Sequence, residues 1–325
     1  MPQLAMLAVP VGLLSGGVVI LFRILVESSQ GMLLPGADVE NYEGLSPALR
    51  LALPVAGGLL IGLLWQALKH GVRNVGITHV MERLAYHQGR LPWRNALMQF
   101  IGAALSIISG HSVGREGPSV HLGATSGSWL GQWLRLPNNT NRTLAACGIA
   151  AAIAASFNTP LAGVIFAMEV VMMEYSLVSF APVILSAVTA TTLTRAVFGN
   201  MPVFIIPHMQ LGSLMELPYV ILMGVVLGTL AAMFIHILER TTKLTNDWPV
   251  WLRFTLAGLC VGLIGLVVPE VMGIGYDTVN HALLGQLGLL LLLTVAIAKL
   301  FATAIGLGLG LPGGLIGPTV VIGAT

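Results

Sequence analysis

The sequence is poor in charge. Only 15 basic and 13 acidic residues occur among its 325, far fewer than a soluble domain needs to cover its surface. Hydrophobic residues make up 56% of the chain, and the mean hydropathy is +0.88. This scarcity excludes a soluble globular protein and predicts an all-α polytopic membrane protein. The net charge of +2 gives no indication of a nucleic-acid partner.

Cysteine is scarce as well. Cys147 and Cys260 lie in apolar segments and indicate neither a disulfide framework nor a metal site. No group of His, Cys or carboxylate residues has metal-ligand spacing, and phosphate-loop and nucleophile motifs are missing from the sequence. The sequence therefore predicts no metal, no cofactor and no enzymatic activity. A signal-peptide cleavage pattern is also missing, so the first apolar stretch is predicted to be a retained span.

Apolar windows of spanning length recur along the chain. They lie near residues 4–25, 48–68, 145–172, 176–198, 216–238, 251–271 and 282–310. Two shorter apolar stretches, 96–110 and 118–134, flank Glu116 and are predicted to be half-helices that meet inside the membrane. The loop at 26–47 carries four acidic residues and no basic one, whereas 69–94 carries five basic residues and one acidic. The positive-inside rule therefore predicts that the second loop is cytoplasmic and the first external.

Glycine and proline interrupt the apolar pattern twice in the same way. Gly114–Thr125 reads GREGPSVHLGAT, and Gly317–Thr325 repeats its frame as GPTVVIGAT two hundred residues later. From each Pro onward, five of eight positions are identical. Pro is favoured at the first position of a helix because it needs no N–H there. Each Gly-Pro is therefore predicted to start a helix inside the membrane.

Such broken helices carry a functional implication. Irregular backbone at membrane depth is tolerated only within protein or beside an aqueous cavity, and transporters place their sites there. Two helix starts aimed at one point form a positive pocket made of backbone dipoles. That pocket can strip an anion of water without fixed cations that would trap it. The repeat therefore predicts an anion transport protein.

These residues resemble the CLC chloride channel and transporter family. The stretch 114–118 matches its GREGP signature in full, and Phe157–Gly163 (FNTPLAG) is similar to the segment that follows it. Gly314–Pro318 (GLIGP) is similar to its Gly-x-Phe-x-Pro motif, with Ile316 where Phe is common. The resemblance implies an inverted-repeat fold with re-entrant helices in the cell (inner) membrane. It also implies chloride as the transported ligand, no cofactor, and a homodimer with one pathway per subunit.

The resemblance further implies one transmembrane domain over residues 1–325. The first repeat covers about 1–200 and a partial second repeat about 214–325. The second repeat stops as its motif helix begins, so the domain is expected to be incomplete at its C-terminus. The later helices of the family, including a Tyr that coordinates the central anion, are expected to be absent.

By the same resemblance Glu116 is the external gate. Its carboxylate occupies an anion position and must swing away or become protonated for the anion to pass. A carboxylate at a helix start is favoured by the helix dipole, so it can mimic the anion that it displaces. The backbone near Arg115 and Gly117 and the amides of Leu315 and Ile316 are implied to bind the central anion.

Two positions depart from the family pattern. The first motif, Gly-Ser-Gly-Ile-Pro, reads NVGIT at 74–78, so Val75 replaces the Ser whose hydroxyl coordinates the anion, while the next residue, Gly76, is retained. A missing donor is expected to weaken the site or change its selectivity. Val170 stands where coupled exchangers carry an internal Glu, which favours passive conduction, and Glu169 before it is a second proton-path candidate with Glu116.

Alternatives to a passive conductor stay open. One is a proton-coupled anion exchanger that uses Glu174 or His121 as its relay. Another, from a different class, is a membrane fragment that inserts but does not transport. Lys299, inside an apolar run, is expected to snorkel or to contact a backbone carbonyl.

Overall fold

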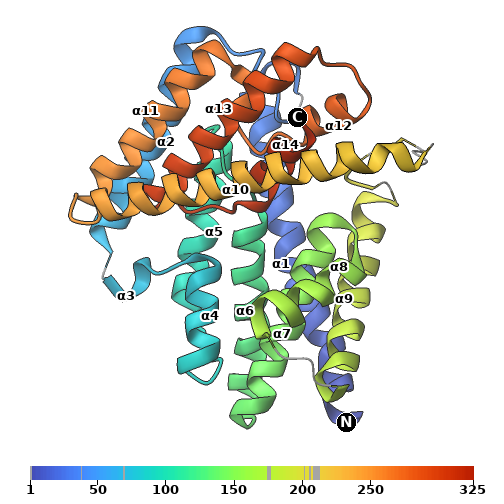
Figure 1. Cartoon of the computed structure of the whole chain (residues 1–325). Coiled ribbons are helices and arrows are strands. Elements are labelled where there is room, and N and C mark those ends of the chain that lie inside the picture. The colour runs from blue at the N-terminus through green and yellow to red at the C-terminus, as the bar shows by residue number, and fades with distance from the viewer. Residues whose placement is uncertain are drawn as a thin grey trace.

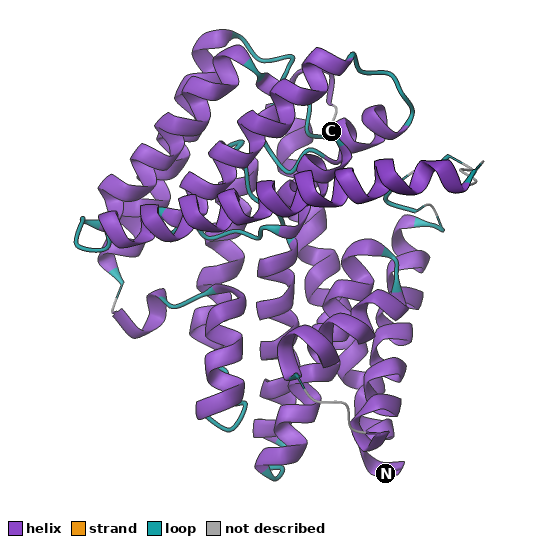
Figure 2. Cartoon of the chain, viewed as in Figure 1, coloured by secondary structure: helices purple, strands orange, loops and turns teal. Residues whose placement is uncertain are grey.

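The computed structural model of the chain is helical throughout, and Figure 2 shows its helices joined by loops. Within the described residues the only strand-like pairing is an isolated antiparallel bridge between Gly114 and Gly314. The structure describes residues 2–37, 39–68, 70–173, 177–200, 202–204, 206–207 and 213–325.

The longer helices account for most of the predicted spans. They are α1 (Pro2–Leu33), α2 (Pro47–Ala67), α4 (Gly76–Tyr86), α5 (Trp93–Ile108), α6 (Glu116–Trp133), α7 (Asn138–Phe157), α9 (Leu177–Phe198), α10 (Leu217–Thr245), α11 (Val250–Val267), α13 (Leu289–Gly308) and α14 (Ile316–Ala324). Shorter pieces are η1 (Pro35–Ala37), α3 (His70–Arg73), α8 (Pro160–Ile165), η2 (Phe166–Met172), η3 (Leu214–Glu216), η4 (Pro269–Val271) and α12 (Tyr276–Leu283). Six helices in the described part of the chain are long and apolar enough to cross a membrane.

The predicted span at 145–172 is wrong. The helix α7 ends at Phe157, because Asn158 adopts the left-handed conformation with φ 58°. Pro160 then disfavours helical geometry at Thr159 and starts the short helix α8. The π-helical segment η2 follows. The apolar run is therefore divided among the C-terminal part of α7, the short helix α8 and η2, and it does not form one membrane-crossing helix.

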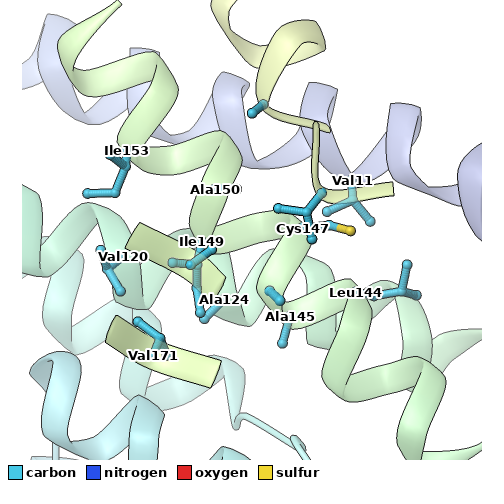
Figure 3. Packing of buried hydrophobic residues seen from close by; sticks show 14 of the residues in the cluster. Val11, Val120, Ala124, Leu144, Ala145, Cys147, Ile149, Ala150, Ile153 and Val171 are labelled. Atoms are coloured by element: carbon cyan, nitrogen blue, oxygen red, sulfur yellow. The ribbon is translucent and has the colours of Figure 1, made fainter. Parts of the chain in front are cut away.

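Helix α7 is the centre of the largest core cluster. Its alanine-rich run is buried between α1, α6 and α9, and Figure 3 shows Ile149 and Ile153 of α7 beside Val120 and Ala124 of α6. Gly123 and Gly148 allow the close approach, because a Cβ on either residue would overlap the carbonyl oxygen of the other. Small residues at such crossings let membrane helices pack through backbone contact.

Helix α10 is packed very differently. In Figure 1 it runs across the bundle, at a large angle to α5 and α6. Of its residues, all of which the structure describes, Phe234 and Thr245 alone are buried, and the helix packs mainly against α13. Its many exposed apolar side chains suit a lipid environment, in which Leu and Val need no protein partner.

The sequence repeat is also a repeat of structure. Helix α5 ends at Ile108 and α6 begins at Glu116, while α13 ends at Gly308 and α14 begins at Ile316. The turns match as well, since Gly110 and Gly310 each have positive φ, 79° and 92°. Both breaks therefore lie at the Gly-Pro frames as predicted, but each helix begins two residues earlier than expected, so that Pro118 and Pro318 are the third residues of α6 and α14 rather than the first. The division of the whole chain into repeats at 1–200 and 214–325 stays a prediction.

Candidate functional site

The two helix breaks meet face to face. Gly114 and Gly314 exchange both backbone hydrogen bonds, each with an N···O distance of 2.7 Å. A Cβ on Gly314 would lie 2.6 Å from the amide nitrogen of Gly117, and one on Gly117 would lie 2.9 Å from the Cα of Gly314. No residue with a side chain fits at either position without moving backbone. The starts of α6 and α14 are thereby held together at one point.

The Glu116 side chain lies at this meeting point and is fully buried. Its Oε2 accepts a hydrogen bond from the Gly317 amide at 3.1 Å, and its Oε1 accepts one from the Tyr276 hydroxyl. Glu116 is the first residue of α6, and Gly317 lies in the first turn of α14. The carboxylate therefore takes its donors from the opposite helix start and from α12.

Arg115 does not turn toward the carboxylate beside it in sequence. Its guanidinium lies over the ring of Tyr276, 5.1 Å from the centroid, and its Nη1 contacts Glu27 Oε1 at 3.4 Å. The side chain is 10% exposed, and its Nε has no hydrogen-bond partner among the described residues. A fixed cation therefore stands near the site, but its charge is shared with Glu27.

The anion-binding roles implied for Leu315 and Ile316 stay predictions. The amide that meets the Glu116 carboxylate is that of Gly317, one residue further along. The Leu315 side chain, 43% exposed, lines an apolar cavity of about 510 Å³ beside Phe234 of α10. Gly117 contributes to the site by its lack of a side chain, which admits Gly314.

Val75 and Gly76 lie at the start of α4. Gly76 has φ 88°, and Val75 is the residue just before the helix. Val75 is partly buried and packs against an apolar cluster that includes Trp65 and Phe254. The structure brings neither residue into hydrogen-bonding contact with Glu116 among the described interactions, so their role in anion binding stays a prediction.

A polar cavity of about 720 Å³ adjoins this helix start. Its lining includes Arg73, Asn74 and Arg253. Asn95 donates to the carbonyl oxygen of Asn74 at 2.9 Å and thereby fixes the loop before α4. The sequence alone predicts no role for Arg253, because a single basic residue within the apolar helix α11 belongs to no motif.

The proton-path candidates separate into exposed and buried groups. Glu169 and Val170 lie in η2 and both are exposed, Val170 at 46%. His121 is fully buried on α6, and its Nε2 lies 3.3 Å from Nδ1 of His79 on α4. Glu174 lies outside the described residues.

The Nδ1 of His121 contacts the side-chain oxygen of Gln99 at 3.5 Å. The side chains of His79, His121 and Gln99 therefore form a buried polar group, and His121 places it on α6, one to two turns after Glu116. The described part of the chain contains no group of three or more His, Cys or carboxylate residues that could hold a metal.

Tyr276 is a residue of the site that no sequence motif predicts. It follows Gly273-Ile274-Gly275, and both glycines have positive φ. Lys299, predicted to snorkel or to contact a carbonyl, is fully buried and donates to the carbonyl oxygens of Val271 and Gly273, each at 2.9 Å. The predicted contact of Lys299 with backbone carbonyls is confirmed. Its two hydrogen bonds stabilise the loop that precedes Tyr276.

The comparisons with known proteins agree on one family. Residues 57–325 match the family described as "Voltage gated chloride channel". A "Putative chloride channel protein ClcB-like" from Ralstonia nicotianae is 36% identical over 300 residues, which cover 90% of this chain and 70% of the relative. An "H(+)/Cl(-) exchange transporter ClcA" from Vibrio cholerae is 32% identical over 240 residues, covering 71% of this chain and 51% of that protein.

The fold is found among solved structures as well. A crystal structure described as a CLC-type fluoride/proton antiporter superimposes with a TM-score of 0.84 and 24% sequence identity. The superposition covers 99% of this chain and 80% of that chain. At this identity the likeness establishes the multi-span helical fold, and the chemistry must come from the residues at the site.

Proposed function

Because the chain belongs to the voltage-gated chloride channel family, the CLC family, we propose that it conducts chloride or a related anion through a pathway closed by Glu116. CLC-type anion transport is its general function. The observation that carries the gate assignment is the position of the Glu116 carboxylate. It lies where two helix starts meet and takes a backbone amide and a hydroxyl as donors.

These donors are the ones that an anion needs. A carboxylate and a halide both accept hydrogen bonds from backbone N–H groups at a helix start. While the carboxylate is in place, an anion cannot occupy the same donors. Protonation removes the charge that holds the carboxylate there, so the side chain can leave and the anion can enter. Acid is therefore expected to open the pathway.

We favour passive conduction over coupled exchange because of Val170. A valine cannot carry a proton, and its side chain is 46% exposed on η2. A proton that crosses the protein would need another titratable group on the path. The two modes are distinguished by measurement, because an exchanger moves protons uphill when chloride flows and a conductor does not.

The pair His79 and His121 favours a second candidate function, proton-coupled exchange. The two ring nitrogens are 3.3 Å apart, which is within reach of direct proton transfer between imidazoles. His121 lies on α6, five residues after Glu116. Buried titratable groups inside a transporter are candidates for a proton path, so this pair would replace the internal Glu.

Anion efflux from proteoliposomes, recorded together with internal pH, tests both candidates. A conductor releases chloride without coupled proton movement. An exchanger takes up protons against their gradient as chloride leaves, and His121→Leu should then abolish proton uptake while chloride still flows. Absence of any anion flux would instead favour a chain that inserts without transporting.

We also propose a homodimer with one pathway in each subunit. Its support is the family membership together with exposed apolar residues on the short helix α8, Leu161 at 69% and Ile165 at 47%. Light scattering on the protein in detergent tests this state. A mass of one subunit would contradict it.

A further inference from the structure

We propose that the Tyr276 hydroxyl is a ligand of the transported anion at the position that Glu116 now occupies, and that Glu40 positions Tyr276 for this role. The proposal rests on the proposed function, in which Glu116 gives up its place to an anion. It adds a side-chain donor from α12 to a site otherwise made of backbone amides.

The Glu116 carboxylate marks where an anion would bind. Its two oxygens take one hydrogen bond each from the Tyr276 hydroxyl and the Gly317 amide. When the carboxylate leaves, both donors lose their acceptor in a buried place. Unsatisfied buried donors are costly, and an anion in the same position satisfies both at once.

A phenol suits this task chemically. A free phenol has a pKa of about 10, so a tyrosine hydroxyl stays a neutral donor in the working pH range. It therefore binds an anion without the fixed charge that would hold it too long. The guanidinium of Arg115, 5.1 Å from the ring centroid, draws electron density from the ring and makes the hydroxyl a stronger donor. Its own charge is partly balanced by Glu27 at 3.4 Å.

The orientation of Tyr276 is fixed from several sides. Glu40 accepts a hydrogen bond from the Tyr276 backbone amide at 2.9 Å. Phe204 packs edge-on against the Tyr276 ring with centroids 5.3 Å apart, and Phe157 lies at 6.4 Å. Glu40 belongs to the loop after α1 and is 236 residues away in sequence. It therefore acts on the anion only through Tyr276, as a positioning residue.

A cavity with charged and polar side chains in its lining adjoins Tyr276. Tyr276, Glu40 and Arg115 all line a cavity of about 370 Å³, together with Arg23 and Asn280. The cavity carries both positive and negative side chains, so it does not itself retain anions strongly. An anion that passes the Glu116 position moves between this space and the paired helix starts. Tyr276 stands between them.

Chloride binding to the Glu116→Gln protein tests the first part of the proposal. This background removes the gate charge, so chloride affinity can be measured by calorimetry in detergent. Tyr276→Phe in this background keeps the ring and removes only the hydroxyl. We expect it to weaken chloride binding by about tenfold or more, as for loss of a hydrogen bond to a charged group. Unchanged chloride affinity would overturn the proposal.

The preference for chloride over thiocyanate gives a second test, because a residue with only a structural role would not change this preference. Chloride holds hydrogen-bond donors more strongly than thiocyanate does, because its charge is less spread out. The loss caused by Tyr276→Phe should therefore be smaller for thiocyanate than for chloride. Equal losses for both anions would indicate damage to the fold and would count against a ligand role.

Two variants of Glu40 test its positioning role in the same background. Glu40→Gln keeps an acceptor for the Tyr276 amide and should leave chloride affinity unchanged. Glu40→Leu removes the acceptor and should weaken chloride binding. In a chain that already carries Tyr276→Phe, adding Glu40→Leu should cause no further loss of chloride affinity. An additional loss in that double variant would show that Glu40 acts independently of Tyr276.

Tyr42→Phe is the matched control. It makes the same chemical change at another buried tyrosine, whose hydroxyl bonds to Gln30 and to the Ile107 carbonyl oxygen. Its chloride affinity should equal that of the background, and a loss as large as that of Tyr276→Phe would overturn the proposal. Anion flux distinguishes failure of the gate assignment from failure of the ligand role. If Glu116→Gln does not increase flux, the gate assignment is wrong. If Glu116→Gln increases flux but Tyr276→Phe does not change chloride affinity, only the ligand role of Tyr276 is refuted.

Discussion

The backbone N–H of Gly114 donates to the carbonyl oxygen of Gly314, and the backbone N–H of Gly314 donates to the carbonyl oxygen of Gly114, each at 2.7 Å. They stand at equivalent places in the two copies of the repeat, 200 residues apart. Each copy thus supplies the partners that the other copy's broken helix lacks. The proposed anion site depends on this pairing, because the pairing brings the Gly317 amide to the Glu116 carboxylate.

Gly314→Ala should prevent this pairing. Its new Cβ would lie 2.6 Å from the Gly117 nitrogen, and overpacking of this kind costs about 1–3 kcal/mol. We expect a lower thermal unfolding temperature in detergent and loss of most anion flux. Gly224→Ala on α10 is the control, because no atom outside its own stretch of helix lies within 4 Å of the added Cβ. Equal stability of both variants would contradict the close approach.

Glu116→Gln should make anion flux constitutive. Wild-type flux is expected to rise as pH falls, because protonation releases the carboxylate from its donors. The glutamine is neutral at every pH, so the flux of the variant should not change with pH and should exceed that of the wild type near neutral pH. Anion efflux from proteoliposomes at several pH values measures this difference. Glu239→Gln changes an exposed side chain of α10 and should keep the pH dependence of the wild type. If Glu116→Gln also kept that pH dependence, Glu116 would not be the gate.

Val75→Ser should restore the hydroxyl donor that the family's first motif provides. One added hydrogen bond to an anion is worth about 1.5–3 kcal/mol, so chloride affinity is expected to rise by tenfold or more, or the preference among anions to change. Calorimetry with chloride, nitrate and thiocyanate measures both effects. Identical affinity and selectivity would mean that position 75 does not face the anion.

Lys299→Met should destabilise the loop that presents Tyr276. The ammonium donates to two buried carbonyl oxygens, and the variant leaves both without this partner, at a cost of about 1–3 kcal/mol. A thermal melt in detergent should show the loss. Lys243→Met removes a lysine whose side chain is 78% exposed and should melt like the wild type. A Lys299→Met protein of wild-type stability would show that the two carbonyls find other partners.

Glu40 should make stability depend on pH. Burial, and then the charge of Asp277, raises the pKa of Glu40 from 4.5 to about 7, against the opposing charges of Arg115 and Lys299. The folded protein therefore binds a proton that the unfolded chain has lost, and stability falls as pH rises from about 4.5 to about 7, by at most about 3 kcal/mol. Glu40→Gln does not titrate, so its melting temperature should fall less over this window. Parallel curves for the two proteins would refute this.

The sequence was sufficient for the helix breaks and for the family. Gly-Pro pairs mark helix starts through local backbone chemistry, which is why the frames at 117 and 317 predict the beginnings of α6 and α14. The same local chemistry was available at Asn158-Thr159-Pro160. The span at 145–172 was predicted from its apolar composition alone, without regard to these turn residues, and it is wrong because α7 ends at Phe157 and α8 begins at Pro160.

The side chains that contact Glu116 or position its partner could not be predicted from the sequence. Tyr276 lies 160 residues from Glu116, and Glu40 lies 236 residues from Tyr276. Neither belongs to a motif, so only the packing of α12 against the helix starts reveals them. His79 and His121 are a similar case, because single histidines in apolar helices give no sign that their rings face each other.

The pairing of the two glycine turns also sets an order of events during synthesis. When Glu116 leaves the ribosome, the amide that will donate to its carboxylate is still 201 residues away in the chain. At roughly 5–20 residues per second, this interval lasts about 10–40 s. Throughout it the first helix start exists without its counterpart, and its carboxylate must be kept hydrated or protonated. The contact between the two helix starts at the centre of the protein can therefore form only after Gly317 has been synthesised.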